Sequence, residues 1–169
     1  MTCRPTHNQT AYELALQLLA RRDLSTSQLR DRLQKSQLSS NDIARTISRL
    51  IENRALDDTR AAIAYARRSA TVKLRGKNRT QRELQARGFA LSVASYAVAT
   101  VFSEVNETTV LERAIQKRLN GPVRTRTQFR KLYQALLRQG FPSEAVACAL
   151  VSRTESGDSF MEEYLDDVQ

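Results

Sequence analysis

The residue types that supply most catalytic and metal-binding chemistry are scarce in this 169-residue chain. It contains one histidine, two cysteines and no tryptophan. The histidine, His7, has no second histidine with which to hold a zinc ion, and Cys3 and Cys148 lie far apart in the sequence. Zinc sites and nucleophile–base pairs need several such groups that can converge. We therefore expect no catalytic residue, no metal site, no cofactor and no disulfide framework.

Phosphate-binding and membrane signatures are missing as well. The segment RGKNRT at 75–80 has a single glycine and lacks the spacing of a Walker loop or a dinucleotide fingerprint. The adjacent carboxylates Asp57 and Asp58 are better explained as helix caps than as metal ligands. No apolar run reaches the roughly 18 residues of a membrane span, and no charged-then-apolar leader opens the sequence. These absences predict a cytoplasmic, non-enzymatic protein that does not enter membranes.

What is abundant is positive charge, and its distribution is uneven. The formal net charge is +9. Residues 60–87 hold nine lysines and arginines against Glu83 alone, and residues 112–140 hold eight against Glu112 alone. Such basic stretches favour an anionic partner, most commonly nucleic acid, although a solvated charged face remains an alternative.

The end of the chain has the opposite charge. Residues 155–169 contain six carboxylates and no basic residue. We hypothesise that this acidic tail covers part of the basic surface and weakens non-specific DNA binding. The alternative is a tail that only improves solubility, and deletion of residues 155–169 separates the two by its effect on DNA affinity.

One pattern occurs three times along the chain. Leu33, Leu84 and Leu136 are separated by 51 and 52 residues, and similar apolar positions follow each of them. A fixed period of this size is typical of stacked supersecondary units, each of which buries its apolar face against a neighbour. The helical spacing of apolar residues and the few glycines and prolines between periodic segments predict an all-α fold of three tandem three-helix repeats. The expected organisation is a flexible tail at 1–9, repeats at 10–56, 57–106 and 107–153, and an acidic tail at 154–169 with a short helix from about 159 to 167.

Capping residues predict where several helices begin. Ser25 with Gln28, and Ser39 or Ser40, should start the second and third helices of the first repeat. Asp57 or Asp58 should start the second repeat, and a capping box of Thr109 with Glu112 should start the third. The last helix of the third repeat should begin at Pro142, because proline suits the first helical turn.

Two glycines occupy matching positions in the second and third repeats. Gly88 and Gly140 each follow a helix and precede a phenylalanine, a place where glycine adopts the left-handed conformation at low cost. Valine at either position should cost about 1–3 kcal/mol of stability. Gln37 takes the same place in the first repeat, where we expect a different turn or some strain.

Three sequence segments resemble those of a known protein family. They are LDD at 56–58, RGKNRTQRELQARGF at 75–89 and YQALLRQGFPSEAV at 133–146. In this order and spacing they resemble the RecX regulatory proteins of bacteria, over about residues 11–153. Within the central segment, Glu83, Leu84 and Gly88 match the family pattern. Two core positions depart from that pattern, because Thr80 replaces an apolar residue and Ala61 replaces an aromatic one.

The resemblance implies an elongated, curved array that binds the RecA recombinase filament and limits its growth, ATP hydrolysis and strand exchange. It also implies a role in DNA repair, homologous recombination and the SOS response. The expected partners are the RecA filament and, more weakly, single-stranded or duplex DNA, with the protein itself a monomer. The rival hypothesis is a sequence-nonspecific nucleic-acid-binding module built from repeats that resemble helix-turn-helix folds. A third hypothesis is an adaptor that recognises only protein. In that case the basic residues take no part in binding.

The basic residues at equivalent places in the second and third repeats are the predicted binding surface, because a solenoid presents equivalent positions along one face. The expected filament-binding and DNA-binding residues are Arg75, Lys77, Arg79, Arg82, Arg87, Arg124, Arg126, Arg130, Lys131 and Arg138. Reversal of Arg75, Lys77 and Arg79 to glutamate should leave the fold intact, because solvent-facing substitutions change stability by only about 0.5 kcal/mol, and it should sharply reduce inhibition of RecA.

Overall fold

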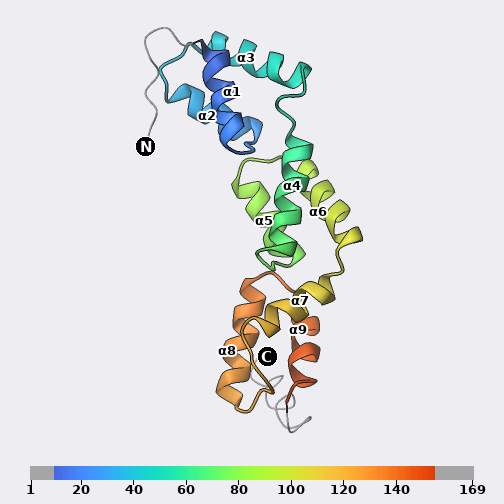
Figure 1. Cartoon of the computed structure of the whole chain (residues 1–169). Helices are drawn as coiled ribbons and strands as arrows, with labels where there is room; N and C mark the ends of the chain where they lie inside the picture. The colour runs from blue at the N-terminus through green and yellow to red at the C-terminus, as the bar shows by residue number, and fades with distance from the viewer. Residues whose placement is uncertain (1–9, 155–169) are drawn as a thin grey trace. The chain divides into compact units, whose positions relative to one another are not determined.

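The structure is a computed structural model that describes residues 10–154 of the chain. Within that range the regular structure is helical, apart from one isolated bridge between Val123 and Thr154, which confirms the all-α prediction (Figure 1). The nine helices are α1 Ala11–Arg21, α2 Thr26–Gln34, α3 Ser40–Glu52, α4 Asp58–Thr71, α5 Lys77–Ala86, α6 Leu91–Glu104, α7 Glu107–Gln116, α8 Arg126–Arg138 and α9 Ser143–Val151. The predicted tail at 1–9, and the acidic residues and short helix predicted after residue 154, lie outside the described residues.

Side-chain caps start the first helices as the sequence indicates. Ser25 caps α2 by accepting the Gln28 N–H at 3.1 Å. Ser39 caps α3 by accepting the Asp42 N–H, also at 3.1 Å. Each hydroxyl satisfies a backbone donor that has no partner within its helix. No helix in residues 10–154 is long and apolar enough to cross a membrane.

Two predicted starts in the third repeat are wrong. The α7 helix does not begin with the Thr109 capping box but at Glu107, because the Asn106 side chain accepts the Thr108 N–H at 2.8 Å. Asparagine is as effective a cap as threonine, so the earlier residue starts the helix. The α9 helix begins at Ser143, and Pro142 is its N-cap residue without a side-chain hydrogen bond.

The described residues pack as two compact units. The first contains residues up to 65 together with 83–97, and the second contains 66–82 together with residues from 98 onward. The division passes through α4, α5 and α6, so each of these helices contributes to both units. The predicted repeat boundaries, which follow the chain, stay predictions.

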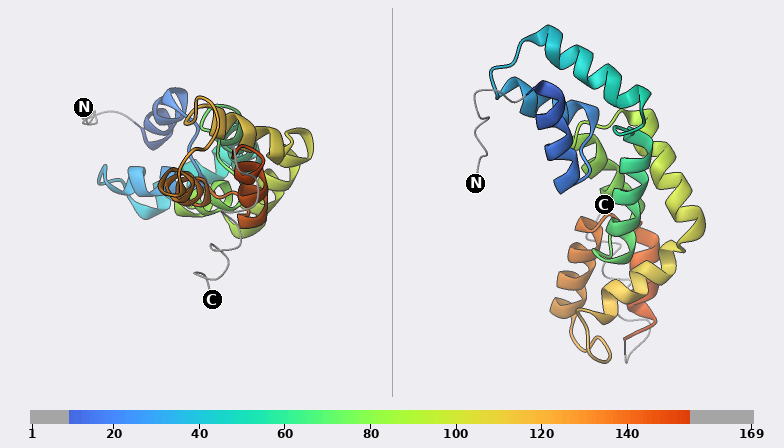
Figure 2. Two further views of the ribbon diagram at one scale, coloured as in Figure 1. Left: turned by 90° about the horizontal axis from the view of Figure 1, so that it is seen from below. Right: turned by 45° about the horizontal axis from the view of Figure 1, so that its top comes forward.

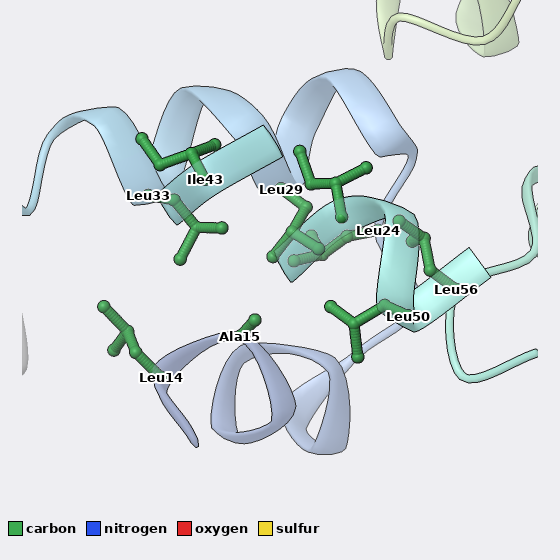
Figure 3. Close-up of a cluster of buried hydrophobic side chains, with 9 residues drawn as sticks. Leu14, Ala15, Leu24, Leu29, Leu33, Ile43, Leu50 and Leu56 are labelled. Carbon is green, nitrogen blue, oxygen red and sulfur yellow. The ribbon is translucent and has the colours of Figure 1, made fainter. Parts of the chain in front are cut away.

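In the first unit, α1, α2 and α3 contact one another and lie side by side in Figure 1 and in the right view of Figure 2. Leu24, Leu29, Leu33 and Leu50 from these helices and their connections point toward a common centre and are at most 1% exposed (Figure 3). Ala15 of α1 is fully buried beside them, and its small side chain permits close helix packing. Removal of this apolar surface from water is the main stabilising contribution to the unit.

In the second unit, α7, α8 and α9 contact one another in the same way. The core contains Ile115 of α7, Phe129 and Leu136 of α8, and Leu150 of α9, each at most 2% exposed. The ring of Phe129 stacks on the half-buried Tyr133 with a centroid distance of 6.2 Å. Apolar side chains from three helices therefore close this core.

The internal repeat corresponds to a shared buried position. Leu33, Leu84 and Leu136 are all completely buried. Thr80, one of the two departures from the family pattern, is completely buried too, and its hydroxyl donates to the Gly76 carbonyl at 3.0 Å. A polar group tolerates burial when it is hydrogen-bonded, so threonine can replace an apolar residue there.

The turns that follow α2, α5 and α8 all have left-handed backbone. Gly88 and Gly140 have φ of 80° and 88°, which confirms the predicted helix ends. Gln37 has φ of 60°, so the first repeat also has a left-handed residue at this place, and a residue with a Cβ atom pays a conformational cost there. The hydrogen bonds of the turns also differ: Phe89 and Phe141 donate to the carbonyls of Leu84 and Leu136, whereas Ser36 and Gln37 donate to the carbonyls of Leu33 and Gln34. Both alternatives that the sequence left open therefore apply.

We expect Gln37→Gly to stabilise the first unit by about 0.5–1 kcal/mol, because glycine adopts positive φ without a steric penalty. Gln34→Gly is the matched control: it removes the same side chain three residues earlier, within α2, and should destabilise by about 0.5–1 kcal/mol. Urea unfolding midpoints measure both changes. A lower midpoint for Gln37→Gly would contradict the assignment of strain to this turn.

Candidate functional site

Most of the ten predicted binding residues are on the surface, and all but Arg87 belong to the second unit. The exposed members are Lys77, Arg82, Arg124, Arg126, Arg130, Lys131 and Arg138. Those in the third repeat lie on α8 or just before it. Arg126 and Arg138 are the two ends of this helix, about 18 Å apart at 1.5 Å per residue. The cations of α8 are therefore spread along its length.

Three of the ten are only partly exposed: Arg75, Arg79 and Arg87. The Arg79 guanidinium donates to the Arg138 carbonyl oxygen at 2.8 Å, which joins the start of α5 to the end of α8. The Arg87 guanidinium lies 4.3 Å from the centre of the Tyr65 ring, and the Tyr65 hydroxyl donates to Glu83 at 2.7 Å. Stacking on an aromatic ring is a favourable use of arginine in a fold. Arg79 and Arg87 thus have a structural role.

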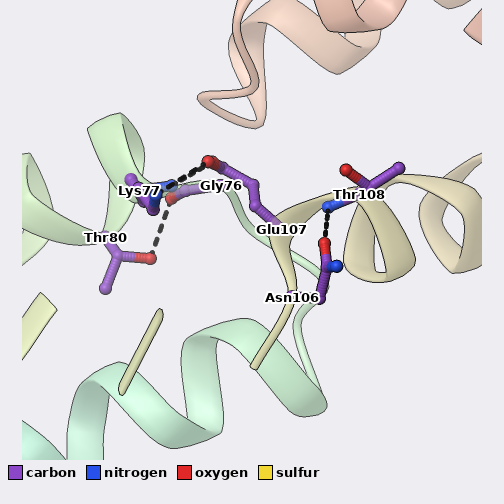
Figure 4. A network of polar contacts seen from close by, with 6 residues as sticks. All are labelled: Gly76, Lys77, Thr80, Asn106, Glu107 and Thr108. Atoms are coloured by element: carbon purple, nitrogen blue, oxygen red, sulfur yellow. Dashed lines mark hydrogen bonds and ion pairs between the residues drawn. The ribbon is translucent and has the colours of Figure 1, made fainter. Parts of the chain in front are cut away.

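Lys77 is exposed but has a partner in the fold. The Glu107 carboxylate accepts the Lys77 backbone N–H at 2.8 Å and forms an ion pair with its ammonium at 3.6 Å (Figure 4). The ammonium also lies 5.9 Å from the centre of the Phe102 ring. In Figure 4, Glu107 points toward the start of α5, where Gly76, Lys77 and Thr80 lie.

These contacts correct one premise of the sequence analysis. Arg75 and Arg79 do not face solvent fully, and Arg79 holds two helix ends together. Reversal of Arg75, Lys77 and Arg79 would disturb the fold as well as the surface charge. The exposed cations Arg82 and Arg130 are better positions at which to test binding, because both residues are exposed and the Arg82 guanidinium donates to the Asn78 carbonyl of its own helix.

A contact that the sequence analysis missed occurs once in each unit. In the first, Asp58 at the start of α4 accepts the N–H and the hydroxyl of Thr26 at 2.8 and 3.0 Å. In the second, Glu107 at the start of α7 accepts the N–H of Lys77. Thr26 and Lys77 are the first residues of α2 and α5, so an acidic residue of the following repeat caps the middle helix of the repeat before it. Asp57 has the predicted local role and accepts the Arg60 N–H at 2.9 Å.

A second contact accompanies each acidic cap. The Ser25 hydroxyl donates to the Arg87 carbonyl at 2.7 Å, and the Gly76 N–H donates to the Gln139 carbonyl at 2.9 Å. Each carbonyl precedes the turn glycine of the next repeat. We call this pair of contacts the repeat joint: one acidic cap and one carbonyl, both at the N-terminal end of a middle helix. In the sequence, the repeat joint is signalled by an acidic residue at the start of the next repeat. Local capping rules assign this residue only to the helix that it begins, so they do not reveal its contact with the repeat before it.

Among residues 10–154, no three histidine, cysteine, aspartate or glutamate side chains form a group that could hold a metal ion. His7 and Cys3 lie outside the described residues, and Cys148 is exposed on α9. The described residues therefore define a helical-repeat protein whose second unit exposes cations on α5, on α8 and just before α8.

Comparison with known proteins places the chain within this class. The model of the first three-helix domain of RecX matches residues 11–50. The chain is 30% identical over 151 residues to the regulatory protein RecX of Chromohalobacter salexigens, an alignment that covers 89% of this chain and 97% of that one. The chain belongs to the RecX family of regulatory proteins.

Other relatives are similar in sequence or in fold. The RecX protein of Geobacillus thermodenitrificans is 28% identical over 143 residues, which are 83% of this chain. The chain spans about half the length of the two Geobacillus relatives it matches, 52% and 54%. The crystal structure of RecX from Lactobacillus salivarius has the same fold, with a TM-score of 0.70 and 18% identity over 84% of this chain and 93% of that one.

Proposed function

We propose that this protein binds the nucleoprotein filament of the RecA recombinase and limits filament extension, ATP hydrolysis and strand exchange. Such an activity modulates recombination and the response to DNA damage. The observation that carries the proposal is the set of exposed cations on α5 and α8 in a chain of the RecX family. A RecA filament offers both phosphates and protein surface, and cations recognise either phosphates or acidic side chains.

The residues we propose for this surface are the seven exposed ones, of which Arg82 and Arg130 are the most direct tests. Arg79 and Arg87 are assigned a supporting role, because they hold helix ends and an aromatic ring in place. The protein acts by binding alone in this proposal, as a monomer and without a cofactor.

The test is DNA-dependent ATP hydrolysis by the cognate RecA with increasing amounts of the purified chain. We expect the steady-state rate to fall in proportion to the filament bound. Hydrolysis that stays unchanged at a concentration where the chain saturates the filament, measured by co-sedimentation, would contradict the inhibitory part of the proposal. No co-sedimentation would contradict the proposed partner.

The second candidate function is nucleic-acid binding without a recombinase, which the basic surface of the second unit also favours. The two functions differ in the affinity of the protein for an oligonucleotide relative to its affinity for the filament. A DNA-binding module should bind an oligonucleotide as tightly as it binds the filament, with a log–log salt slope of about 0.7 per neutralised phosphate on single strands. A filament regulator should bind the filament far more tightly than the oligonucleotide at the same salt concentration.

A further inference from the structure

A pocket of about 350 Å³ opens in the second unit where the end of α7 meets the start of α8. Its described lining consists of Arg118, Thr125, Thr127, Gln128, Lys131 and Leu132. Two of these side chains are cationic, three are polar and uncharged, and none is acidic. Arg118 comes from the turn after α7, and Lys131 comes from the second turn of α8, so the two positive charges are contributed by different elements.

The polar groups around this pocket offer hydrogen-bond donors. Arg118 donates one N–H to the Ala114 carbonyl at 2.9 Å, which anchors the guanidinium and leaves further donors on the same planar group. The Gln128 amide oxygen accepts the Arg124 N–H at 3.0 Å, and the NH₂ group of the same side chain is its remaining donor. The Thr125 hydroxyl accepts the Gln128 N–H at 3.2 Å and can donate its own hydrogen. A set of donors with two cations and no described acid suits an anion.

The repeat joint supplies an independent argument. At α2 and at α5, an acidic oxygen of the following repeat lies at the N-terminal end of the middle helix: Asp58 in one case and Glu107 in the other. The equivalent end of α8 is the pocket. No further helix follows α9 within the described residues, and the described lining of the pocket contains no acidic residue. Where two repeats hold an anionic oxygen, the third has an opening lined by Arg118 and Lys131.

We propose that this pocket binds a phosphate group of a nucleic-acid backbone. The inference rests on the proposed function, since it identifies DNA phosphate as one ligand of the basic surface, and it adds Arg118, which the sequence analysis did not select. Arginine can contact two phosphate oxygens at once, and lysine adds a second charge from a different element. A backbone phosphodiester carries one negative charge, like a carboxylate, and spreads it over two non-bridging oxygens that two cationic side chains can share.

The test compares two double variants with equal loss of charge. Arg118→Gln with Lys131→Gln removes both cations of the pocket. Arg113→Gln with Lys117→Gln removes two exposed cations of the neighbouring α7 segment that do not line it. The probe is a fluorescent oligothymidylate, and its anisotropy gives affinity at several salt concentrations. We expect the pocket variant to bind about tenfold more weakly, as for loss of a charged hydrogen bond, with a salt slope smaller by about 0.7. The control variant should lose much less affinity.

Equal weakening by the two variants would overturn the proposal, because only overall charge would then matter. The acidic tail is the other source of anionic oxygens. If the pocket binds the tail, the pocket variant should bind the oligonucleotide more tightly than the wild type. Deletion of residues 155–169 should then raise the affinity of the wild type but not that of the pocket variant. This pair of results would overturn the proposal. Circular dichroism and unfolding midpoints establish that each variant is folded.

The proposed regulation of RecA can be tested separately from the proposed phosphate site. Inhibition of RecA ATP hydrolysis by the Arg113 and Lys117 control variant measures the regulatory activity without a change in the pocket. If that inhibition is normal and the pocket variant binds the oligonucleotide like the control, the phosphate site is wrong and the proposed function stands. If wild-type protein neither binds the oligonucleotide nor inhibits RecA, both are wrong.

Discussion

Gly140→Ala is expected to cause the largest loss of stability of any alanine substitution at a glycine within residues 10–154, about 4 kcal/mol or more. Two costs add at this position. The backbone has φ of 88°, where a residue with a Cβ atom pays about 1–2 kcal/mol. The new Cβ atom would also lie 2.4 Å from the Arg79 nitrogen and 2.9 Å from its Cα atom, and backbone atoms at the start of α5 cannot move aside locally. Urea or thermal unfolding of the purified variant measures the loss.

Two other glycines separate these costs. Gly121 has φ of 104° with no heavy atom within 4 Å of the added Cβ, so Gly121→Ala should show the conformational cost alone, about 1–2 kcal/mol. Gly76 has no positive φ, but its Cβ would lie 2.5 Å from the Gly140 carbonyl oxygen, so Gly76→Ala should show the steric cost alone. The expected order of destabilisation is Gly140, then Gly76, then Gly121. A Gly140 variant no less stable than the Gly121 variant would refute the close approach of the two backbones.

At Gly88, an added Cβ atom would also clash with a neighbouring residue, but at a smaller expected cost in stability. A Cβ atom there would lie 2.7 Å from the Ser27 Cβ and 2.9 Å from its hydroxyl oxygen. The obstacle is a small side chain rather than backbone, so Gly88→Ala should cost less than Gly140→Ala. The sequence alone treated these two glycines as equivalent, because both have the same place in the repeat.

Charge reversal at Arg82 and Arg130 is expected to raise the concentration of protein needed to inhibit RecA ATP hydrolysis by an order of magnitude or more. Both side chains are exposed, and they lie on α5 and α8 of the same unit. Glutamate at these positions replaces attraction to an anionic filament by repulsion. Because surface substitutions usually change stability by only about 0.5 kcal/mol, the double variant should stay folded.

The matched control is Arg30→Glu with Arg45→Glu. These exposed residues of α2 and α3 lie outside the proposed surface, and the double variant changes net charge by the same amount. We expect the control to retain most of the inhibition. If both double variants inhibit like the wild type, the surface of α5 and α8 does not bind the filament. If both lose inhibition equally, net charge rather than this surface governs binding.

The caps illustrate how far local rules extend. Ser25 was predicted from the three residues that follow it, and its hydroxyl does accept the Gln28 N–H. The same hydroxyl also donates to the carbonyl of Arg87, 62 residues away, and no local pattern indicates that bond. Asp58 behaves similarly: it was predicted to start α4, and its carboxylate instead binds Thr26 at the start of α2. Local sequence identified polar residues at helix starts and several of their local caps, but it did not identify the bonds that Ser25 and Asp58 make to distant segments.

The basic residues show the same limit. Their charge and number are visible in the sequence, yet Arg79 and Arg138 meet through a backbone carbonyl while Arg82 and Arg130 remain exposed. The Arg118 and Lys131 pocket also depends on two segments 13 residues apart whose relative placement follows from the packing of α7 against α8.

The sequence by itself determined the helices, the period of 51 and 52 residues, the buried leucines that recur with it and the left-handed turns at Gly88 and Gly140. These features depend on apolar periodicity and on conformational preferences within a few residues, which any reader of the chain can evaluate. Only the tertiary structure decided which cations are exposed, where the acidic caps bind and where a pocket opens. The caps and the partial burial of Arg79 depend on contacts between helix ends 30 or more residues apart, and the pocket depends on two segments 13 residues apart. The geometry of all of them is set by how whole helices pack.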